Sequence, residues 1–113
     1  MTPILGVVIV KTMKVIKRKV LVDFWTIHPK TRGPLEHWYQ LTKAGRRRQP
    51  ADVKKAFGTN VDVLPNNRAV FDIKDNDFRL IAEINYRRQA VFIRFLDTHA
   101  VYDKVDATTV KCF

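Results

Sequence analysis

Three stretches of alternating polar and apolar residues in the second half of the chain constrain its fold most strongly. They cover residues 68–74, 78–86 and 90–96, and the turn-forming pairs Asp75-Asn76 and Arg88-Gln89 separate them. A period of two is typical of a β-strand with one buried face, and such short links join antiparallel neighbours. The pattern therefore predicts a three-stranded antiparallel meander.

The alternation also sorts the side chains of this meander onto two faces. One face is wholly apolar and is expected to lie beneath helices; it carries Ala69, Phe71, Ile73, Phe78, Leu80, Ala82, Ile84, Val91, Ile93 and Phe95. The other face mixes apolar and charged side chains; it carries Arg68, Val70, Asp72, Lys74, Arg79, Ile81, Glu83, Asn85, Phe92, Arg94 and Leu96. Two-residue loops at both turns predict the cross-strand pairs Asp72–Arg79, Arg68–Glu83 and Glu83–Arg94.

The first half of the chain has a helical period instead. Residues 17–28 and 34–43 place apolar side chains at helical spacing, and Pro29 ends the first of these segments. The short link predicts an antiparallel pair of helices. A third helix is expected over residues 51–57, and a short strand over residues 13–16. This order predicts an α+β domain, with N-terminal helices packed on one face of a twisted antiparallel β-sheet.

The charge of the chain favours a polyanionic partner. The 113 residues carry a formal net charge of +10, and the isoelectric point is about 10.1. Residues 1–56 hold 13 Lys and Arg against 3 Asp and Glu, whereas residues 57–113 hold 8 of each. Such asymmetry indicates an electrostatic docking surface for RNA, DNA or an acidic protein. A basic surface that serves only solubility is the alternative.

The single cysteine and the apolar N-terminal residues limit which sites, locations and domain boundaries the sequence is compatible with. Cys112 is the only cysteine, so neither an intramolecular disulfide nor a cysteine-based metal site can form. This favours a cytoplasmic protein. Residues 3–10 are apolar but far too few to span a membrane. We expect residues 1–12 to be an N-terminal extension and residues 13–113 to form a single domain.

The predicted row Arg68–Glu83–Arg94 has two interpretations. Cross-strand ion pairs on a solvated face are common and contribute little stability. Alternatively, several arginines on one surface bind a phosphate and stabilise its developing charge. His99 and Tyr102 follow soon after the last strand, at the edge of this surface. One helical turn would bring them together, and a histidine can act as general acid or base, which favours the second interpretation.

Four segments lie in or just after the predicted meander. They are residues 66–74, 78–82 and 92–95, and the run Thr98-His99-Ala100-Val101-Tyr102-Asp103-Lys104. With residues 13–16 and 38–39, these segments resemble the HigB toxin family of the RelE/ParE superfamily. The resemblance covers residues 13–107, and the His-x-x-Tyr-Asp run is its most specific part. It implies a compact RelE-like fold and an endoribonuclease that acts on mRNA, typically in the ribosomal A site.

The same resemblance implies a chemistry without metal or other cofactor. The ribose 2′-OH would attack the adjacent phosphate and leave a 2′,3′-cyclic phosphate and a 5′-OH. Arg79 and Arg94 would bind the scissile phosphate. His99 would be the general acid or base, with Tyr102 as its partner or as a stacking platform. The assisting or RNA-binding residues would be Lys74, Arg68 and Asn67, and Glu83 stays open between a base and a structural ion.

The basic first half fits docking on the ribosome. Arg46, Arg47, Arg48, Lys54 and Lys55, with the cluster at residues 14–19, would contact the ribosomal RNA backbone and add affinity without sequence choice. A solvated loop is the alternative for the arginine run. Family likeness also implies a cognate antitoxin, a HigA-like helix-turn-helix protein encoded alongside.

Three other functions compete with the nuclease. The first is a ParE-like toxin that inhibits DNA gyrase, the second a non-catalytic RNA-binding module, and the third a degenerate toxin that only binds its antitoxin. The grouping of His99 and Tyr102 with Arg79 and Arg94 argues against the first. The second would tolerate loss of His99.

Overall fold

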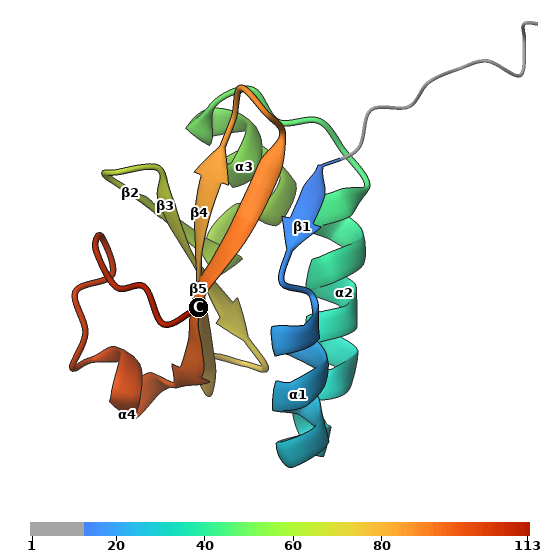
Figure 1. Ribbon diagram of the computed structural model, residues 1–113, viewed down its shortest axis with the longest axis vertical. Helices are drawn as coiled ribbons and strands as arrows, with labels where there is room; N and C mark the ends of the chain where they lie inside the picture. The colour runs from blue at the N-terminus through green and yellow to red at the C-terminus, as the bar shows by residue number, and fades with distance from the viewer. Residues whose placement is uncertain (1–12) are drawn as a thin grey trace, which may run out of the picture.

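A computed structural model describes residues 13–113, and the expected N-terminal extension over residues 1–12 lies outside them. A sheet of five strands runs through the described part in the order β1-β5-β4-β3-β2 (Figure 1). The strands are β1 (Lys14–Ile16), β2 (Val61–Leu64), β3 (Arg68–Ile73), β4 (Phe78–Asn85) and β5 (Ala90–Thr98). β1 pairs with β5 in parallel, and all other neighbours among these five strands are antiparallel.

The helices lie mainly on one side of this sheet. They are α1 (Lys19–Ile27), α2 (Arg32–Lys43), α3 (Pro50–Phe57) and α4 (His99–Tyr102), with 3₁₀ turns η2 (Pro29–Thr31) and η3 (Gly58–Asn60). α1 and α2 run antiparallel beside each other, as the short link between them predicted (Figure 1). α3 packs against β2, and α4 follows β5 directly.

The main core lies between the helices and the sheet. Leu21 of α1 and Leu35 of α2 are fully buried together with strand residues such as Phe71, Leu80 and Ile93. These strand residues belong to the face that the alternation placed beneath helices. The α+β class and the position of the helices are therefore confirmed.

Two features of the sheet lie beyond the local sequence pattern. β2 has only four residues, which is too short to show a repeated alternation, and Pro65 follows it directly. β1 pairs with β5 in parallel, so that Lys14 lies opposite Ala90. Parallel pairing joins distant parts of a chain, and no local periodicity reports it.

A β-bulge changes the register between β4 and β5. The predicted pairs of β3 with β4, Asp72–Arg79 and Arg68–Glu83, are confirmed. Between the turn and this bulge, however, Asn85 pairs with Ala90 and Glu83 lies opposite Phe92, because four residues and not two connect the strands. The predicted Glu83–Arg94 register is therefore wrong, although Arg94 still reaches the Glu83 carboxylate at 2.8 Å.

The bulge also exchanges two side chains between the faces. Leu96 joins the main core, whereas Phe95 lies with Val70 and Ile81 on the opposite face. The alternation placed Phe95 beneath the helices and Leu96 on the charged face, and both assignments are wrong. An extra residue in one strand shifts every later side chain to the other face, so strict alternation fails beyond it.

The face opposite the main core, called the open face below, carries a second and smaller core. Val70, Ile81 and Phe95 form it, and each is at most 3% exposed. α4 and the C-terminal segment, residues 103–113, lie over this face (Figure 1). The residues that cover the three buried ones include Tyr102, Val105, Ala107 and Val110. No helix within residues 13–113 is both long and apolar enough to cross a membrane.

Candidate active site

Helix α4 positions His99 and Tyr102 at the end of β5. The hydroxyl of Thr98 accepts a hydrogen bond from the backbone N–H of Val101 (3.3 Å), the usual N-cap arrangement. The backbone N–H of His99 donates to the carbonyl of Asp77 (3.0 Å), which ties α4 to the turn before β4. The single helical turn brings the two rings to 6.1 Å between centroids.

Arg79 is the buried arginine beside this helix. Only 9% of the residue is exposed. Its Nη1 lies 3.3 Å from Oδ1 of Asp72 and donates to the carbonyl of Asn76 (3.1 Å). Its guanidinium carbon lies over the ring of Tyr102, 5.5 Å from the centroid. A carboxylate and an aromatic ring thus orient the planar guanidinium, which directs its remaining N–H donors.

Burial raises the pKa of Tyr102 above its ordinary value of 10.0, and the positive charge of Arg79 opposes this shift. The carboxylates of Asp62, Asp103 and Asp72 add smaller upward contributions. The phenol therefore stays protonated at neutral pH. Its O–H is available as a proton donor to a ligand beside Arg79.

His99 has a carboxylate partner of its own. Its Nε2 lies 3.2 Å from Oδ1 of Asp103, four residues further on. The side chain of His99 is 41% exposed, so a ligand can reach the ring. A neutral imidazole held at one nitrogen presents the other nitrogen as an acceptor. The spacing of four was visible in the sequence and could have identified Asp103 as the partner.

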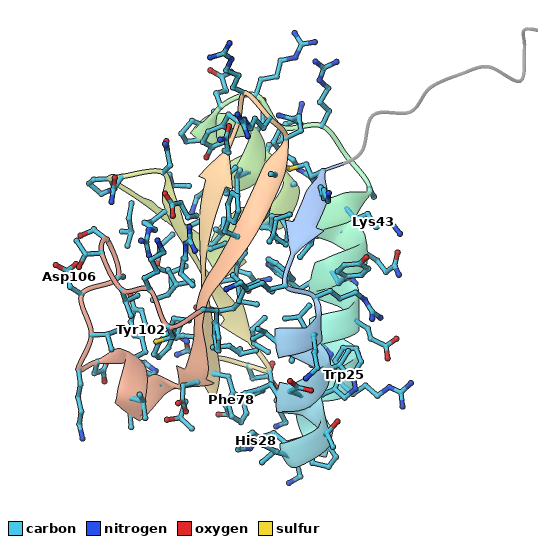
Figure 2. The ribbon with its side chains drawn as sticks, in the orientation of Figure 1. Trp25, His28, Lys43, Phe78, Tyr102 and Asp106 are labelled. Carbon is cyan, nitrogen blue, oxygen red and sulfur yellow. The ribbon has the colours of Figure 1, made fainter. Side chains whose placement is uncertain are left out.

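A cleft of about 520 Å³ opens beside Tyr102, between α3, β2 and α4. Lys54 and Asp62 contribute to its lining, and Lys54 donates to the carbonyl of Val61 (2.9 Å). Figure 2 shows Tyr102 on the opposite side of the sheet from Trp25 of α1. We refer to Arg79, His99 and Tyr102, with their partners Asp72 and Asp103, as the α4 site.

The C-terminal segment covers the two other arginines of the open face. Arg68 is 4% exposed, and its Nη1 donates to the carbonyl of Val110 (2.6 Å). Arg94 donates to Glu83 Oε1 (2.8 Å) and to the carbonyl of Phe113 (3.1 Å). Glu83 Oε1 also lies 3.9 Å from Nη2 of Arg68. The row is thus engaged with the protein's own oxygens, and we leave Arg68 and Arg94 out of the α4 site.

Lys74 and Asn67 are grouped with other parts of the fold. Nζ of Lys74 lies 3.3 Å from Oδ2 of Asp77, and Lys74 lines a cavity together with His28 after α1. Asn67 precedes β3 with a φ of 59° and lines a depression with Glu83. Neither residue contributes to the cleft beside Tyr102.

The basic loop after α2 contains one structural arginine and two exposed ones. Arg47 is 6% exposed and donates to the carbonyls of Thr42 and Leu41 (both 2.9 Å) at the end of α2. Its guanidinium satisfies the last carbonyls of the helix, so we leave Arg47 out of the RNA-binding residues. Arg46 and Arg48, on either side of it, are exposed.

The turn between β4 and β5 lies against this basic loop. Oε1 of Gln89 accepts from the backbone N–H of Arg47 (3.0 Å), and its Nε2 donates to the Arg47 carbonyl. Arg87 and Arg88 in the same turn are exposed. We call the resulting group the basic end; it comprises Arg46, Arg48, Arg87 and Arg88. Arg87 and Arg88 were missed from the sequence because a contact 42 residues apart brings them to the loop.

The two lysines of α3 face different surroundings. Lys54 lines the cleft beside Tyr102, whereas Lys55 lines a depression with Arg46 and Arg48. Both side chains are exposed. Within residues 13–113, no group of three His, Cys, Asp or Glu side chains is arranged to hold a metal ion.

Comparison with known proteins identifies the family. A model of the HigB toxin family, described as the RelE-like toxic component of a toxin–antitoxin system, matches residues 31–105, which include α4 and strands β2 to β5. An mRNA interferase HigB from Escherichia coli is 30% identical over 80 residues, which cover 69% of this chain and 77% of that relative. These matches confirm the resemblance, and the chain belongs to the HigB toxin family, the RelE-like toxic components of toxin–antitoxin systems.

Proposed function

We propose that this toxin is an endoribonuclease that cleaves mRNA at the α4 site. The similar Escherichia coli protein is named an mRNA interferase, and a net charge of +10 suits an RNA substrate. The observation that carries the proposal is the placement of Arg79, which is held by Asp72 and lies over the ring of Tyr102. With His99 beside Tyr102, an anion binder, a neutral phenol and an imidazole lie together, and RNA cleavage uses such groups.

The proposed reaction is attack of a ribose 2′-oxygen on the adjacent phosphorus. The 2′-hydroxyl gives its proton to a base as the new bond from oxygen to phosphorus forms. The bond from phosphorus to the 5′-oxygen breaks, and that oxygen takes a proton from an acid. The products are a 2′,3′-cyclic phosphate and a 5′-hydroxyl end.

The groups of the α4 site suit the three tasks of this reaction. His99 is the base, because Asp103 at Nε2 leaves Nδ1 as the acceptor and stabilises the imidazolium that forms. Tyr102 is the acid, because its raised pKa keeps the phenol protonated until the proton is transferred to the leaving 5′-oxygen. Arg79 donates to the non-bridging phosphate oxygens, and its orientation by Asp72 limits the reorganisation needed in the transition state.

The basic end supplies a second RNA contact in this proposal. Arg79 lies near the start of β4, and Arg87 lies two residues beyond its end, so roughly 20 Å or more separates the two regions. Contacts at that distance add affinity without sequence choice. We propose that the ribosome and its bound mRNA fill both regions, and that a HigA-like helix-turn-helix antitoxin is the inhibitory partner.

Primer extension on a reporter mRNA tests the proposal in bacteria that express wild type, Arg79→Ala or His99→Ala. We expect cuts within the reading frame for wild type, and about 10²–10³-fold less cutting for Arg79→Ala, the scale of one transition-state donor. Arg32→Ala is the matched control, because Arg32 is an exposed arginine on α2 paired with Glu36. Growth arrest without cuts would favour gyrase inhibition, and full activity of His99→Ala would remove His99 from the mechanism.

The requirement for the ribosome needs a separate measurement. Purified toxin is added to a naked mRNA and to the same mRNA in stalled ribosomes, and the ends of the products are mapped. We expect cleavage in the ribosomal complex, with 2′,3′-cyclic phosphate and 5′-hydroxyl ends. Equal cleavage of naked mRNA would show that the ribosome is not required.

A further inference from the structure

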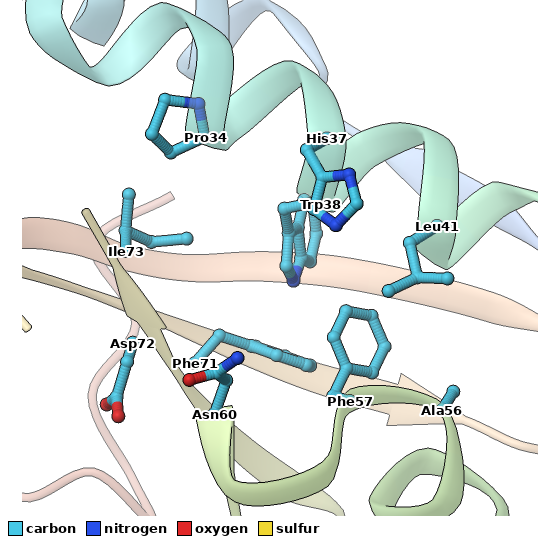
Figure 3. Close-up of a pocket in the computed structure, with 10 residues that line it drawn as sticks. All are labelled: Pro34, His37, Trp38, Leu41, Ala56, Phe57, Asn60, Phe71, Asp72 and Ile73. Atoms are coloured by element: carbon cyan, nitrogen blue, oxygen red, sulfur yellow. The ribbon is translucent and has the colours of Figure 1, made fainter. Parts of the chain in front are cut away.

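A cavity of about 240 Å³, partly open to solvent, lies between α2, the segment of α3 and η3, and β3. Figure 3 shows its aromatic walls, with Trp38 projecting from α2 toward Phe71 of β3 and Phe57 beside them. The ring of Phe71 lies 5.5 Å from that of Trp38 and 4.7 Å from that of Phe57, both edge to face. Asn60 and His37 add polar groups to the lining. We call this space the Trp38 cavity.

The indole N–H of Trp38 is the feature that internal packing does not explain. Trp38 is 3% exposed, and its Nε1 has no hydrogen-bond partner within the described residues. Figure 3 shows this nitrogen at the end of the indole that points into the space between α2 and β3. A buried N–H without an acceptor is destabilising, and the nearby ring of Phe71 is a weak acceptor at best. The cavity therefore combines aromatic walls and a few polar groups with one buried donor that has no acceptor.

Asp72 connects this cavity with the α4 site. The residue contributes to the lining of the cavity, while its carboxylate points away from Trp38 (Figure 3). Oδ1 of that carboxylate lies 3.3 Å from Nη1 of Arg79. An occupant of the Trp38 cavity is thus separated by a single residue from the guanidinium that would bind the scissile phosphate.

We propose that the Trp38 cavity binds one nucleobase and, resting on the proposed function, that the RNA substrate supplies it. A nucleobase is flat, packs against aromatic rings and carries carbonyl or ring-nitrogen acceptors for the Trp38 N–H. The volume of the Trp38 cavity, about 240 Å³, suits a nucleobase, because a cavity of about 150 Å³ already binds benzene. A phosphate is unsuited to a lining of three aromatic rings that also includes the acidic residue Asp72. An aliphatic side chain of a protein partner would leave the indole N–H without an acceptor.

Tryptophan fluorescence gives a direct test. The chain has two tryptophans, so Trp25→Phe leaves Trp38 as the single reporter. Nucleoside 5′-monophosphates carrying each of the four RNA bases are titrated into this variant, and ribose 5-phosphate is the control ligand. We expect saturable quenching by at least one monophosphate and none by ribose 5-phosphate, because the base is the part that enters the cavity.

Two matched substitutions locate the binding. Ala56→Met on α3 fills the cavity, whereas Ala44→Met at the exposed C-cap of α2 adds the same side chain elsewhere. We expect Ala56→Met to weaken monophosphate binding about tenfold or more, the scale of one lost base stack, and Ala44→Met to leave it unchanged. Trp38→Phe, measured by calorimetry, removes the N–H and keeps an aromatic wall. Thermal unfolding of each variant verifies that the fold is intact.

The outcomes separate this inference from the proposed nuclease. No saturable quenching by any monophosphate, or equal binding by Ala56→Met, would overturn the cavity as a nucleobase site. Quenching by the antitoxin alone would also overturn it and assign the cavity to a protein side chain. If monophosphates bind but wild type cuts no mRNA, the proposed function fails and the cavity binds free nucleotides. If mRNA is cut and Ala56→Met leaves kcat/KM and the cut positions unchanged, RNA is not the source of the base.

Discussion

The guanidinium carbon of Arg79 lies 5.5 Å from the centre of the Tyr102 ring, while Nη1 of the same group lies 3.3 Å from Asp72 Oδ1. This relationship joins three elements, because Arg79 belongs to β4, Asp72 to β3 and Tyr102 to α4. A planar guanidinium can stack on the ring and pair with the carboxylate at the same time, and an ammonium cannot. The geometry at Arg79 is therefore specific to arginine.

Arg79→Lys should lower cleavage strongly and RNA binding only slightly. Lysine keeps the positive charge, so the salt dependence of binding is preserved. It loses the planar donor group that, in the proposed mechanism, faces the transition state, so we expect kcat to fall about 10²-fold. Single-turnover cleavage and filter binding on the same RNA measure the two effects. Equal losses in cleavage and binding would show that Arg79 only holds the RNA.

The raised pKa of Tyr102 predicts how the stability of the protein responds to alkaline pH. Its pKa in the folded protein is raised above the ordinary 10.0, mainly by burial, so folding favours the neutral phenol. This contribution to stability is fully present below about pH 10 and is lost as the pH rises through the folded-state pKa. The free energy of unfolding should therefore fall above about pH 10, and less so in Tyr102→Phe.

Urea unfolding at a series of alkaline pH values measures this fall. Burial also raises the pKa of Tyr86, so Tyr86→Phe should reduce the fall in the same direction, and the double variant should reduce it further. Arg79→Ala should raise the pKa of Tyr102 more, because the Arg79 charge opposes the shift. A fall that is identical in wild type and Tyr102→Phe would show that Tyr102 does not titrate differently on unfolding.

Substitutions of Arg46 and Arg47 should affect different properties, RNA binding for Arg46 and stability for Arg47, although the two residues are adjacent in the sequence. Arg47→Ala removes a buried guanidinium from the carbonyls of Thr42 and Leu41, and we expect a loss of about 1–3 kcal/mol in the free energy of unfolding. Arg46→Ala should leave stability nearly unchanged, since Arg46 is exposed, and should weaken RNA binding. Urea midpoints and RNA titrations distinguish them; a stable Arg47→Ala would mean that Arg47 does not cap α2.

Deletion of residues 108–113 should expose Arg68 and Arg94. Both now donate to carbonyls of this segment, at Val110 and Phe113. The truncated protein should be less stable by about 1–2 kcal/mol, because Val110 no longer covers the small core on the open face. It should bind RNA with a steeper salt dependence, since two arginines become available to phosphates.

Binding to an RNA oligomer over a range of salt concentrations tests this deletion. Two additional phosphate contacts predict a slope of log affinity against log salt that is about 1.4 steeper for single-stranded RNA. Arg68→Ala in the truncated protein should reverse part of this steepening of the slope. An unchanged slope would mean that Glu83 alone keeps both arginines from RNA, through the contacts it already makes with them.

Local sequence patterns determined the helices, the meander and part of its register. The alternation over β3 and β4, with a tight turn between them, predicted the pair Asp72–Arg79 that holds the α4 site together. The turn itself is explained by its residues, since Asp75 and Asn76 adopt φ values of 51° and 81°, a region that Asp and Asn tolerate well. The spacing of His99 and Tyr102 likewise predicted their approach within one helical turn.

Only the tertiary structure decided which arginines remain available to a ligand. Arg47 meets Gln89, and Arg68 meets Val110, across 42 residues in each case. Periodicity and turn chemistry describe neighbours within one strand, helix or turn, so they carry no information on what packs over a charged side chain. In the sequence Arg47, Arg68 and Arg79 are all basic residues; in the fold the oxygens that surround each guanidinium distinguish a helix cap, an arginine covered by the C-terminal segment and the arginine paired with Asp72 in the α4 site.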